Sequence, residues 1–248
     1  MSKPRLDQLM VERGLAESRA KAQALVLAGQ VFSGERCLDK PGRTVAPDTP
    51  IEVRAPAVPY VSRGGVKLAH GLDHFGIDPA GMVALDVGAS TGGFTDVLLH
   101  RGAARVYALD VGHGQLDWRL RNDPRVVALE GVNARRLSRA HVPEPLDLVV
   151  CDVSFISLEL ALPPALALAG PAASLIALVK PQFEVGKGQV GHGGVVRDPA
   201  LHRAVCARIA HWLTDQHGWH VLGVSESPIT GPKGNREFLI AATRRDNS

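Results

Sequence analysis

The stretch that most constrains the fold runs from Met82 to Asp96, with the sequence MVALDVGASTGGFTD. Its first half is a short apolar run, which is typical of a buried strand. Three glycines then allow a tight turn whose backbone a ligand can approach closely, and Phe94 begins a helix. The glycines are Gly88, Gly92 and Gly93. A strand, a glycine turn and a helix in this order predict a nucleotide-binding site.

The turn does not match the dinucleotide fingerprint G-x-G-x-x-G, because Ser90 stands where the second glycine would meet a pyrophosphate. A second strand, 105–109, ends at Asp110, whose carboxylate can accept hydrogen bonds from ribose hydroxyls. A ribose without a pyrophosphate suggests S-adenosylmethionine rather than NAD. The expected cofactor residues of this region are Asp86, Gly88, Ser90, Gly92, Gly93, Phe94 and Asp110. Another kind of α/β domain with a glycine turn is the alternative.

Further apolar strands are expected at 126–129, 146–150, 175–179, 220–224 and 238–241, with helical segments between most of them. This alternation predicts an α/β fold with a mostly parallel, Rossmann-like sheet covered on both faces. In such sheets functional groups collect at the carboxyl ends of the strands. Asp152 and Lys180 occupy such ends and are therefore candidate site residues.

Two charged residues stand where the local pattern disfavours them. Lys67 lies near the start of a predicted helix, where the helix dipole is unfavourable to a cation. Glu237 leads into the apolar strand Phe238–Ile240. Both positions suggest a function, although solvent exposure of the lysine, or an edge strand facing water, would also explain them.

The remaining composition describes a protein with no visible export signal, membrane span or metal site. The uncharged window 160–179 is interrupted by prolines and Gly170, which divide it into a helix, a turn and a strand. Cys37, Cys151 and Cys206 form neither a C-x-x-C pair nor an even set, so we expect no disulfide framework and no metal, in a reducing cytoplasm. The net charge of +3 is weak support for an anionic partner.

Residues 1–54 form a separate small unit, because apolar residues recur at helical spacing before a short β-rich part. A proline-rich linker, 55–61, separates it from residues 62–248. The pattern RLDQLMVERGLAESRAKAQALVLAGQVFSGE resembles the small α+β RNA-binding domain first recognised in a ribosomal small-subunit protein. The resemblance implies that Arg5, Arg19 and Lys21 lie on structured RNA, and Arg63 at the start of the second domain is assigned to the same surface.

The second domain resembles the FtsJ-like ribose methyltransferases in five contexts, SRGGVKL, DVGASTGG, CDVSFISL, LVKPQFE and NREFLI. With the N-terminal unit and the segment GGVVRDP, the chain is similar to the TlyA family, which is also labelled hemolysin. This resemblance implies methylation of cytidine ribose 2′-hydroxyls in ribosomal RNA or ribosomal subunits with S-adenosylmethionine. It assigns a catalytic tetrad, with Lys180 acting on the hydroxyl, and places Asn133 near the adenine. The tetrad is Lys67, Asp152, Lys180 and Glu237.

Two other functions remain open at this stage. A ribosome-assembly protein could use both domains only to bind RNA, although the four tetrad residues argue against it. A pore-forming hemolysin is the other alternative, but the sequence shows neither an amphipathic hairpin nor a clean spanning segment.

Overall fold

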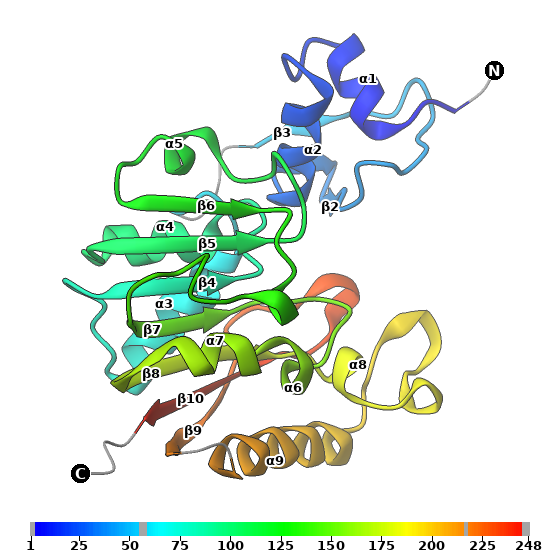
Figure 1. Cartoon of the computed structure of the whole chain (residues 1–248). Coiled ribbons are helices and arrows are strands. Elements are labelled where there is room, and N and C mark those ends of the chain that lie inside the picture. The colour runs from blue at the N-terminus through cyan, green and yellow to red at the C-terminus, as the bar shows by residue number, and fades with distance from the viewer. Residues whose placement is uncertain (1–2, 55–58, 216–217, 245–248) are drawn as a thin grey trace.

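The computed structural model describes residues 3–54, 59–215 and 218–244, and it contains two sheets (Figure 1). The larger sheet has the strand order β6-β5-β4-β7-β8-β10-β9. Its strands are β4 (Val83–Val87), β5 (Arg105–Asp110), β6 (Val126–Glu130), β7 (Leu146–Cys151), β8 (Ala169–Val179), β9 (Trp219–Glu226) and β10 (Phe238–Arg244). Strand β10 runs antiparallel to both β8 and β9, and the other neighbouring strands are parallel. The predicted mostly parallel α/β sheet is confirmed.

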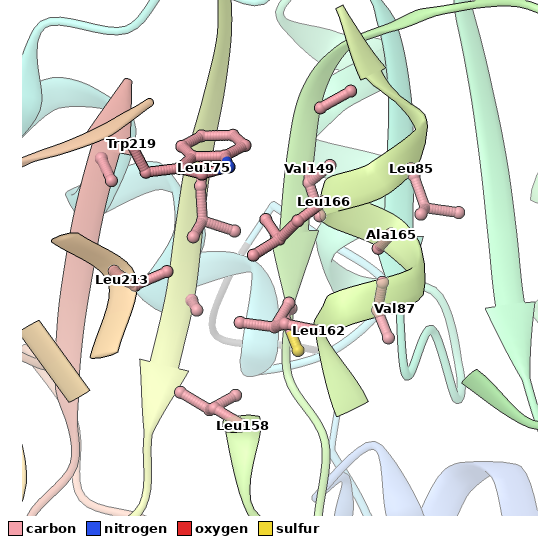
Figure 2. Close-up of a cluster of buried hydrophobic side chains, with 14 of the residues drawn as sticks. Leu85, Val87, Val149, Leu158, Leu162, Ala165, Leu166, Leu175, Leu213 and Trp219 are labelled. Atoms are coloured by element: carbon pink, nitrogen blue, oxygen red, sulfur yellow. The ribbon is translucent and has the colours of Figure 1, made fainter. Parts of the chain in front are cut away.

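Helices cover both faces of this sheet, so alternate residues of one strand enter different cores. Ala84 packs toward α3 (Gly64–Phe75) and α4 (Gly93–His100), while Leu85 packs toward the opposite face. That opposite face carries α6 (Leu158–Ala161), α7 (Pro163–Leu168) and α9 (Pro199–Asp215), whose leucines meet those of the strands in Figure 2. Burial on both sides explains why the strands are continuously apolar.

Shorter helices occupy the connections of this domain. They are α5 (Trp118–Arg121), α8 (Pro181–Glu184) and the 3₁₀ turns Ala134–Arg136, Lys187–Gln189, His192–Gly194 and Pro232–Gly234.

The uncharged window 160–179 contains a helix and a strand, as expected, but the turn predicted between them is wrong. Strand β8 already begins at Ala169 and includes Gly170 and Pro171. The pairing register of β7 with β8 shifts between Leu146 and Leu148, so an irregular start to the strand takes the place of the turn. Among all residues that the structure describes, no helix is long and apolar enough to cross a membrane.

The N-terminal unit has its own core and its own sheet of order β2-β1-β3. Its elements are α1 (Leu6–Glu12), α2 (Arg19–Leu27), β1 (Val31–Ser33), β2 (Arg36–Cys37) and β3 (Glu52–Val53). Ser18 caps α2, since its Oγ accepts a hydrogen bond from the Lys21 backbone N–H at 3.2 Å. Residues 55–58 of the predicted linker lie outside the described residues.

The two units meet at one edge of the large sheet. In Figure 1 the blue N-terminal unit lies beyond the arrowheads of β5 and β6, at the carboxyl ends of the parallel strands. Arg63, which precedes α3, packs so closely on Gly29 that a Cβ there would lie 3.2 Å from the Arg63 Cδ. Its guanidinium also donates to the Thr230 carbonyl at 3.1 Å. Arg63 therefore contacts the N-terminal unit and the loop that leads into β10.

Candidate active site

Two lysine–carboxylate ion pairs lie at the carboxyl edge of the sheet. Lys67, in the first turn of α3, donates from Nζ to Glu237 Oε2 at 2.6 Å. Lys180, at the end of β8, has its Nζ 2.5 Å from Asp152 Oδ1, at the end of β7. Lys67 and Lys180 are each 8% exposed and Glu237 is 1% exposed. Because buried charges require partners, the pairing accounts for the out-of-pattern lysine and glutamate.

The two pairs are also close enough to influence one another. Burial by itself raises the pKa of Asp152, but the positive charges of Lys180 and Lys67 outweigh it, so the pKa lies below its ordinary value. Asp152 therefore stays a carboxylate and keeps holding Lys180. The four predicted tetrad residues form one connected charge group with no net charge.

Glu237 is held at the end of a tight hairpin. A Cβ on Gly231 would lie 2.0 Å from Glu237 Oε1, so only glycine leaves room for this carboxylate. Within the described parts of the chain, Oε1 has no hydrogen-bond partner. Asn235 closes the hairpin through its carbonyl and accepts from the Val196 N–H, which fastens the GGVVRDP segment beside the tetrad.

The glycines of the turn are required because other parts of the protein pack directly against them. Gly88 and Gly92 have φ values of 87° and 95°, a region that favours glycine. A Cβ at Gly88 would lie 2.7 Å from the Asp152 carbonyl oxygen, and one at Gly92 would lie 2.3 Å from Leu120. The same atom at Gly93 would meet Ser62 Oγ at 2.2 Å.

Asp86 supports the turn from below. Its Oδ2 accepts from the backbone N–H and the hydroxyl of Thr95, at 2.9 and 2.7 Å, which fixes the start of α4. Its Oδ1 is buried with no hydrogen-bond partner in the described residues. Burial raises the pKa of Asp86 to about 7, and the nearby Asp152 and Asp110 charges add to the rise. A buried acceptor without a donor fits a cationic ligand group near the turn.

Asp110 holds the other side of the turn. Its two carboxylate oxygens accept from the N–H groups of Ser90 and Gly112, both at 2.7 Å. Val111, the next residue, is 70% exposed, which leaves apolar surface beside the carboxylate. Asn133 follows β6, and its side chain accepts from the Arg135 N–H at 3.0 Å. An acidic group, an apolar surface and a polar strand end together suit an adenosine.

Three of the four predicted RNA-binding residues lie in the N-terminal unit, and the fourth lies where the two units meet. Arg5 and Arg19 both contact Asp7 in the N-terminal unit. Lys21 is exposed in the first turn of α2. Arg63 lies at the contact between the two units, as described above.

The model of the FtsJ-like methyltransferase family matches residues 60–244, and that of the S4 domain matches residues 4–51. A 16S/23S rRNA (cytidine-2′-O)-methyltransferase TlyA from Mycobacterium tuberculosis is 50% identical over 95% of this chain and 88% of its own. The chain is a TlyA-type member of the FtsJ-like methyltransferase family. Hemolysin A from Brachyspira hyodysenteriae is also similar to this FtsJ-like protein, with 41% identity over 95% of the chain and 98% of that relative.

Solved structures agree with this membership. A structure described as a hemolysin from Streptococcus thermophilus superposes with a TM-score of 0.76 and 40% identity, covering 99% of this FtsJ-like chain and 90% of that one. An O-methyltransferase from Bacillus cereus, 18% identical with a TM-score of 0.51, covers 73% of this chain and 80% of its own and shares the fold. The predicted family and fold are confirmed.

Sequence reasoning missed two residues beside the tetrad of this FtsJ-like protein. Ser154 Oγ accepts a hydrogen bond from Lys180 Nζ at 2.9 Å. Phe155 is 89% exposed, has a φ of 66°, and its ring lies 4.8 Å from that of Phe183. A bulky residue with positive φ is strained, and a phenylalanine so exposed is uncommon. The available signal was a phenylalanine four residues after β7 ends at Cys151.

Proposed function

We propose that this protein transfers the methyl group of S-adenosylmethionine to the 2′-hydroxyl of a cytidine ribose in ribosomal RNA. The observation that carries the proposal is the pairing of two buried lysines with two carboxylates at the same sheet edge as the glycine turn. The activity for which the Mycobacterium tuberculosis relative is named supports both the reaction and the substrate.

The glycine turn and its neighbours would hold the cofactor. Asp110 retains acceptor capacity for the ribose hydroxyls, since each carboxylate oxygen has two lone pairs and accepts one hydrogen bond from the residues that the structure describes. Asn133 would face the adenine, and ionised Asp86 would favour the ammonium group of the methionine part. The other residues assigned to this site are Gly88, Ser90, Gly92, Gly93 and Phe94. S-adenosylmethionine supplies an electrophilic methyl group.

The tetrad would position the ribose and remove its proton. As the 2′-oxygen forms its bond to the methyl carbon, the carbon–sulfur bond breaks and the hydroxyl proton has to leave. Lys180 Nζ would accept that proton, while Asp152 and Ser154 hold the amine at a fixed point. Lys67 and Glu237 would orient the hydroxyl from the other side. Lys180 would act here in its amine form, which carries one proton fewer than the ammonium of the ion-paired state described above.

RNA would reach this edge from the N-terminal unit. Arg5, Arg19, Lys21 and Arg63 would contact the phosphate backbone. Phe155 would stack on a base at the reaction site, because it follows Ser154, which contacts Lys180, and its exposed aromatic ring offers the flat surface that unpaired bases prefer. Ribosomal RNA or a ribosomal subunit is then the partner, which agrees with the predicted cytoplasmic location.

The test is methylation of ribosomal RNA by the purified protein. Ribosomal subunits from cells that lack this protein are incubated with it and radiolabelled S-adenosylmethionine, and 2′-O-methyl sites are mapped in the RNA. We expect label on cytidine ribose, and little or none with a Lys180→Ala variant. The control substrate is the same RNA carrying 2′-deoxycytidine at the mapped site.

Two outcomes contradict the proposal. Cofactor and RNA binding without methyl transfer would support a non-catalytic assembly role. Label that stays on the 2′-deoxycytidine substrate would place the methyl group on the base, so the enzyme would not be a ribose methyltransferase.

A further inference from the structure

The N-terminal unit buries one carboxylate beneath two arginines. Asp7 is 0% exposed, whereas the side chains of Arg5 and Arg19 are 46% and 52% exposed. Arg5 donates from Nε and one terminal nitrogen to the two oxygens of Asp7, at 3.1 and 3.0 Å. Arg19 donates to Oδ2 at 3.2 Å, and Gln23 donates to the same oxygen at 2.8 Å. The buried carboxylate thus holds both guanidinium groups on their protein side, while the rest of each arginine side chain is open to solvent.

A fifth residue limits the orientation of Arg5. A Cβ built on Gly42 would lie 3.2 to 3.3 Å from three atoms of the Arg5 guanidinium, so the glycine backbone lies directly against this group. Only two of the five N–H groups of Arg5 are used by Asp7. The planar fork of a guanidinium suits phosphate oxygens when its remaining donors point outward.

Stability alone does not account for this arrangement. Replacement of a buried ion pair by apolar residues is often neutral or stabilising, so a buried carboxylate is weak support for folding. The hydrogen bonds from Arg5, together with those from Gln23 and Arg19, outweigh burial and hold the pKa of Asp7 far below its usual range. Asp7 is therefore a permanent negative charge beneath a surface that would be more positive without it. If only net charge determined RNA affinity, the protein would bind RNA more tightly without Asp7.

We infer that Asp7 is a positioning residue for RNA binding, which holds Arg5 and Arg19 at the spacing and orientation needed to clamp the RNA phosphate backbone. The inference rests on the proposed function, because it assumes that the N-terminal unit binds ribosomal RNA. It predicts that an anion strengthens binding to a polyanion, which is the opposite of what net charge predicts.

The test compares two substitutions that change the charge equally. Asp7→Asn and Asp48→Asn each remove one negative charge, and Asp48 is an exposed residue of the same unit. Binding to purified ribosomal subunits is measured by filter binding across a salt series. We expect Asp7→Asn to bind about 10-fold more weakly with a salt slope shallower by about 1 to 2, because fewer phosphate contacts form. Asp48→Asn should bind as tightly as the original protein or slightly more tightly.

Steady-state methylation provides a second readout. Asp7→Asn should raise the KM for ribosomal subunits while kcat is retained, because its effect is confined to docking. A folded Asp7→Asn protein that binds as tightly as Asp48→Asn would overturn the inference. The Arg5→Ala/Arg19→Ala double variant tests the underlying assumption: if it binds normally, these arginines do not contact the RNA and the proposed RNA surface fails. If the double variant loses RNA binding but Asp7→Asn does not, the arginines contact the RNA and only the inferred role of Asp7 is wrong.

A charge-neutral variant covers the case in which Asp7→Asn does not fold. Gly42→Ala alters no charge and lies on exposed backbone, but its Cβ presses on the Arg5 guanidinium. We expect RNA binding to weaken about 3-fold with an unchanged melting temperature. Unchanged RNA binding in Gly42→Ala would overturn the inference, because Arg5 would then tolerate displacement.

Discussion

The N-terminal unit and the tetrad both pair cations with carboxylates, but the cations differ in kind and in how far they are exposed to solvent. Asp7 is covered by two arginines that stay about half-exposed. At the sheet edge, Asp152 and Glu237 each hold a lysine that is 8% exposed. The first group has a net charge of +1 and the second has none.

The choice of cation suits the two tasks proposed above. Arginine keeps its proton in proteins and presents a planar fork, which suits a lasting contact with phosphate. Lysine can lose its proton, which suits a site that must take one from a hydroxyl. A buried carboxylate that contacts an exposed arginine fixes the orientation of the guanidinium group. A carboxylate beside a buried lysine instead neutralises the positive charge of the lysine.

The largest effect is expected when the lysine at position 180 of the tetrad is replaced by arginine. Lys180→Arg keeps the positive charge but provides no group that can accept a proton. We expect the single-turnover methylation rate to fall by roughly 10²- to 10⁴-fold, as for loss of general-base catalysis, while binding of cofactor and RNA persists. Lys3→Arg, an exposed position, is the matched control. A folded Lys180→Arg enzyme with a near-normal rate would leave Lys180 as a positioning charge.

The next effect concerns stability and compares a buried pair with an exposed one. Glu237→Gln leaves Lys67 buried without a carboxylate, and the free energy of unfolding should fall by about 3 to 5 kcal/mol. Glu226 forms an ion pair with Arg236 in the same hairpin, with both side chains about half-exposed, so Glu226→Gln should cost less than about 1 kcal/mol. Urea denaturation measures both. Equal losses would show that burial does not distinguish the pairs.

Asp86 is a buried carboxylate that lacks a cation, and it should respond to pH accordingly. Its pKa of about 7 lies above the ordinary value of 3.8, so the native state binds more protons than the unfolded state between these two values. Its contribution to stability is therefore present below about pH 4 and is lost as the pH rises through 7. Asp86→Asn should be more stable than the original protein by about 2 to 4 kcal/mol at pH 8 and similar at pH 4. Thermal or urea unfolding at both pH values provides the test, and a pH-independent difference would contradict it.

The smallest effect is expected when Arg19 of the N-terminal unit is replaced by lysine. Arg19→Lys retains the charge but loses the fork, so RNA affinity should fall by a few-fold, or about 1 kcal/mol, with kcat unchanged. Arg101→Lys, beyond the end of α4, is the control. If Arg19→Lys instead slows the single-turnover rate at saturating RNA, the separation between docking and chemistry drawn above does not hold.

The sequence predicted the sheet, and it singled out charged residues that the structure brings together at one end of it, because a lysine or glutamate in an apolar context is unusual. It did not predict how they pair, since Lys67 and Glu237 are 170 residues apart. Ser154 and Phe155 were missed because a hydroxyl and a phenylalanine after a strand carry little pattern of their own. Tertiary contacts determine which side chains lie next to one another at the carboxyl ends of the strands, and these contacts cannot be read from the local sequence.

Asp7 and the glycines show the same limit. Asp7 occupies an ordinary place in a short helix, and only the structure brings Arg19 and Gln23 over it. The glycines were predicted to admit a ligand, but Gly88, Gly92 and Gly93 each make room for another part of the protein. Their contacts with the cofactor remain a prediction.

The contact of Ser62 with Gly93 joins two parts of the active site mechanically. Ser62 lies just ahead of α3, which carries Lys67, and Gly93 is the first residue of α4 at the glycine turn. Because the two backbones are packed without a gap, a displacement of α3 would also move the glycine turn. A protein engineer who enlarges Gly93 in order to alter the predicted cofactor site would therefore displace the helix that carries Lys67 at the same time.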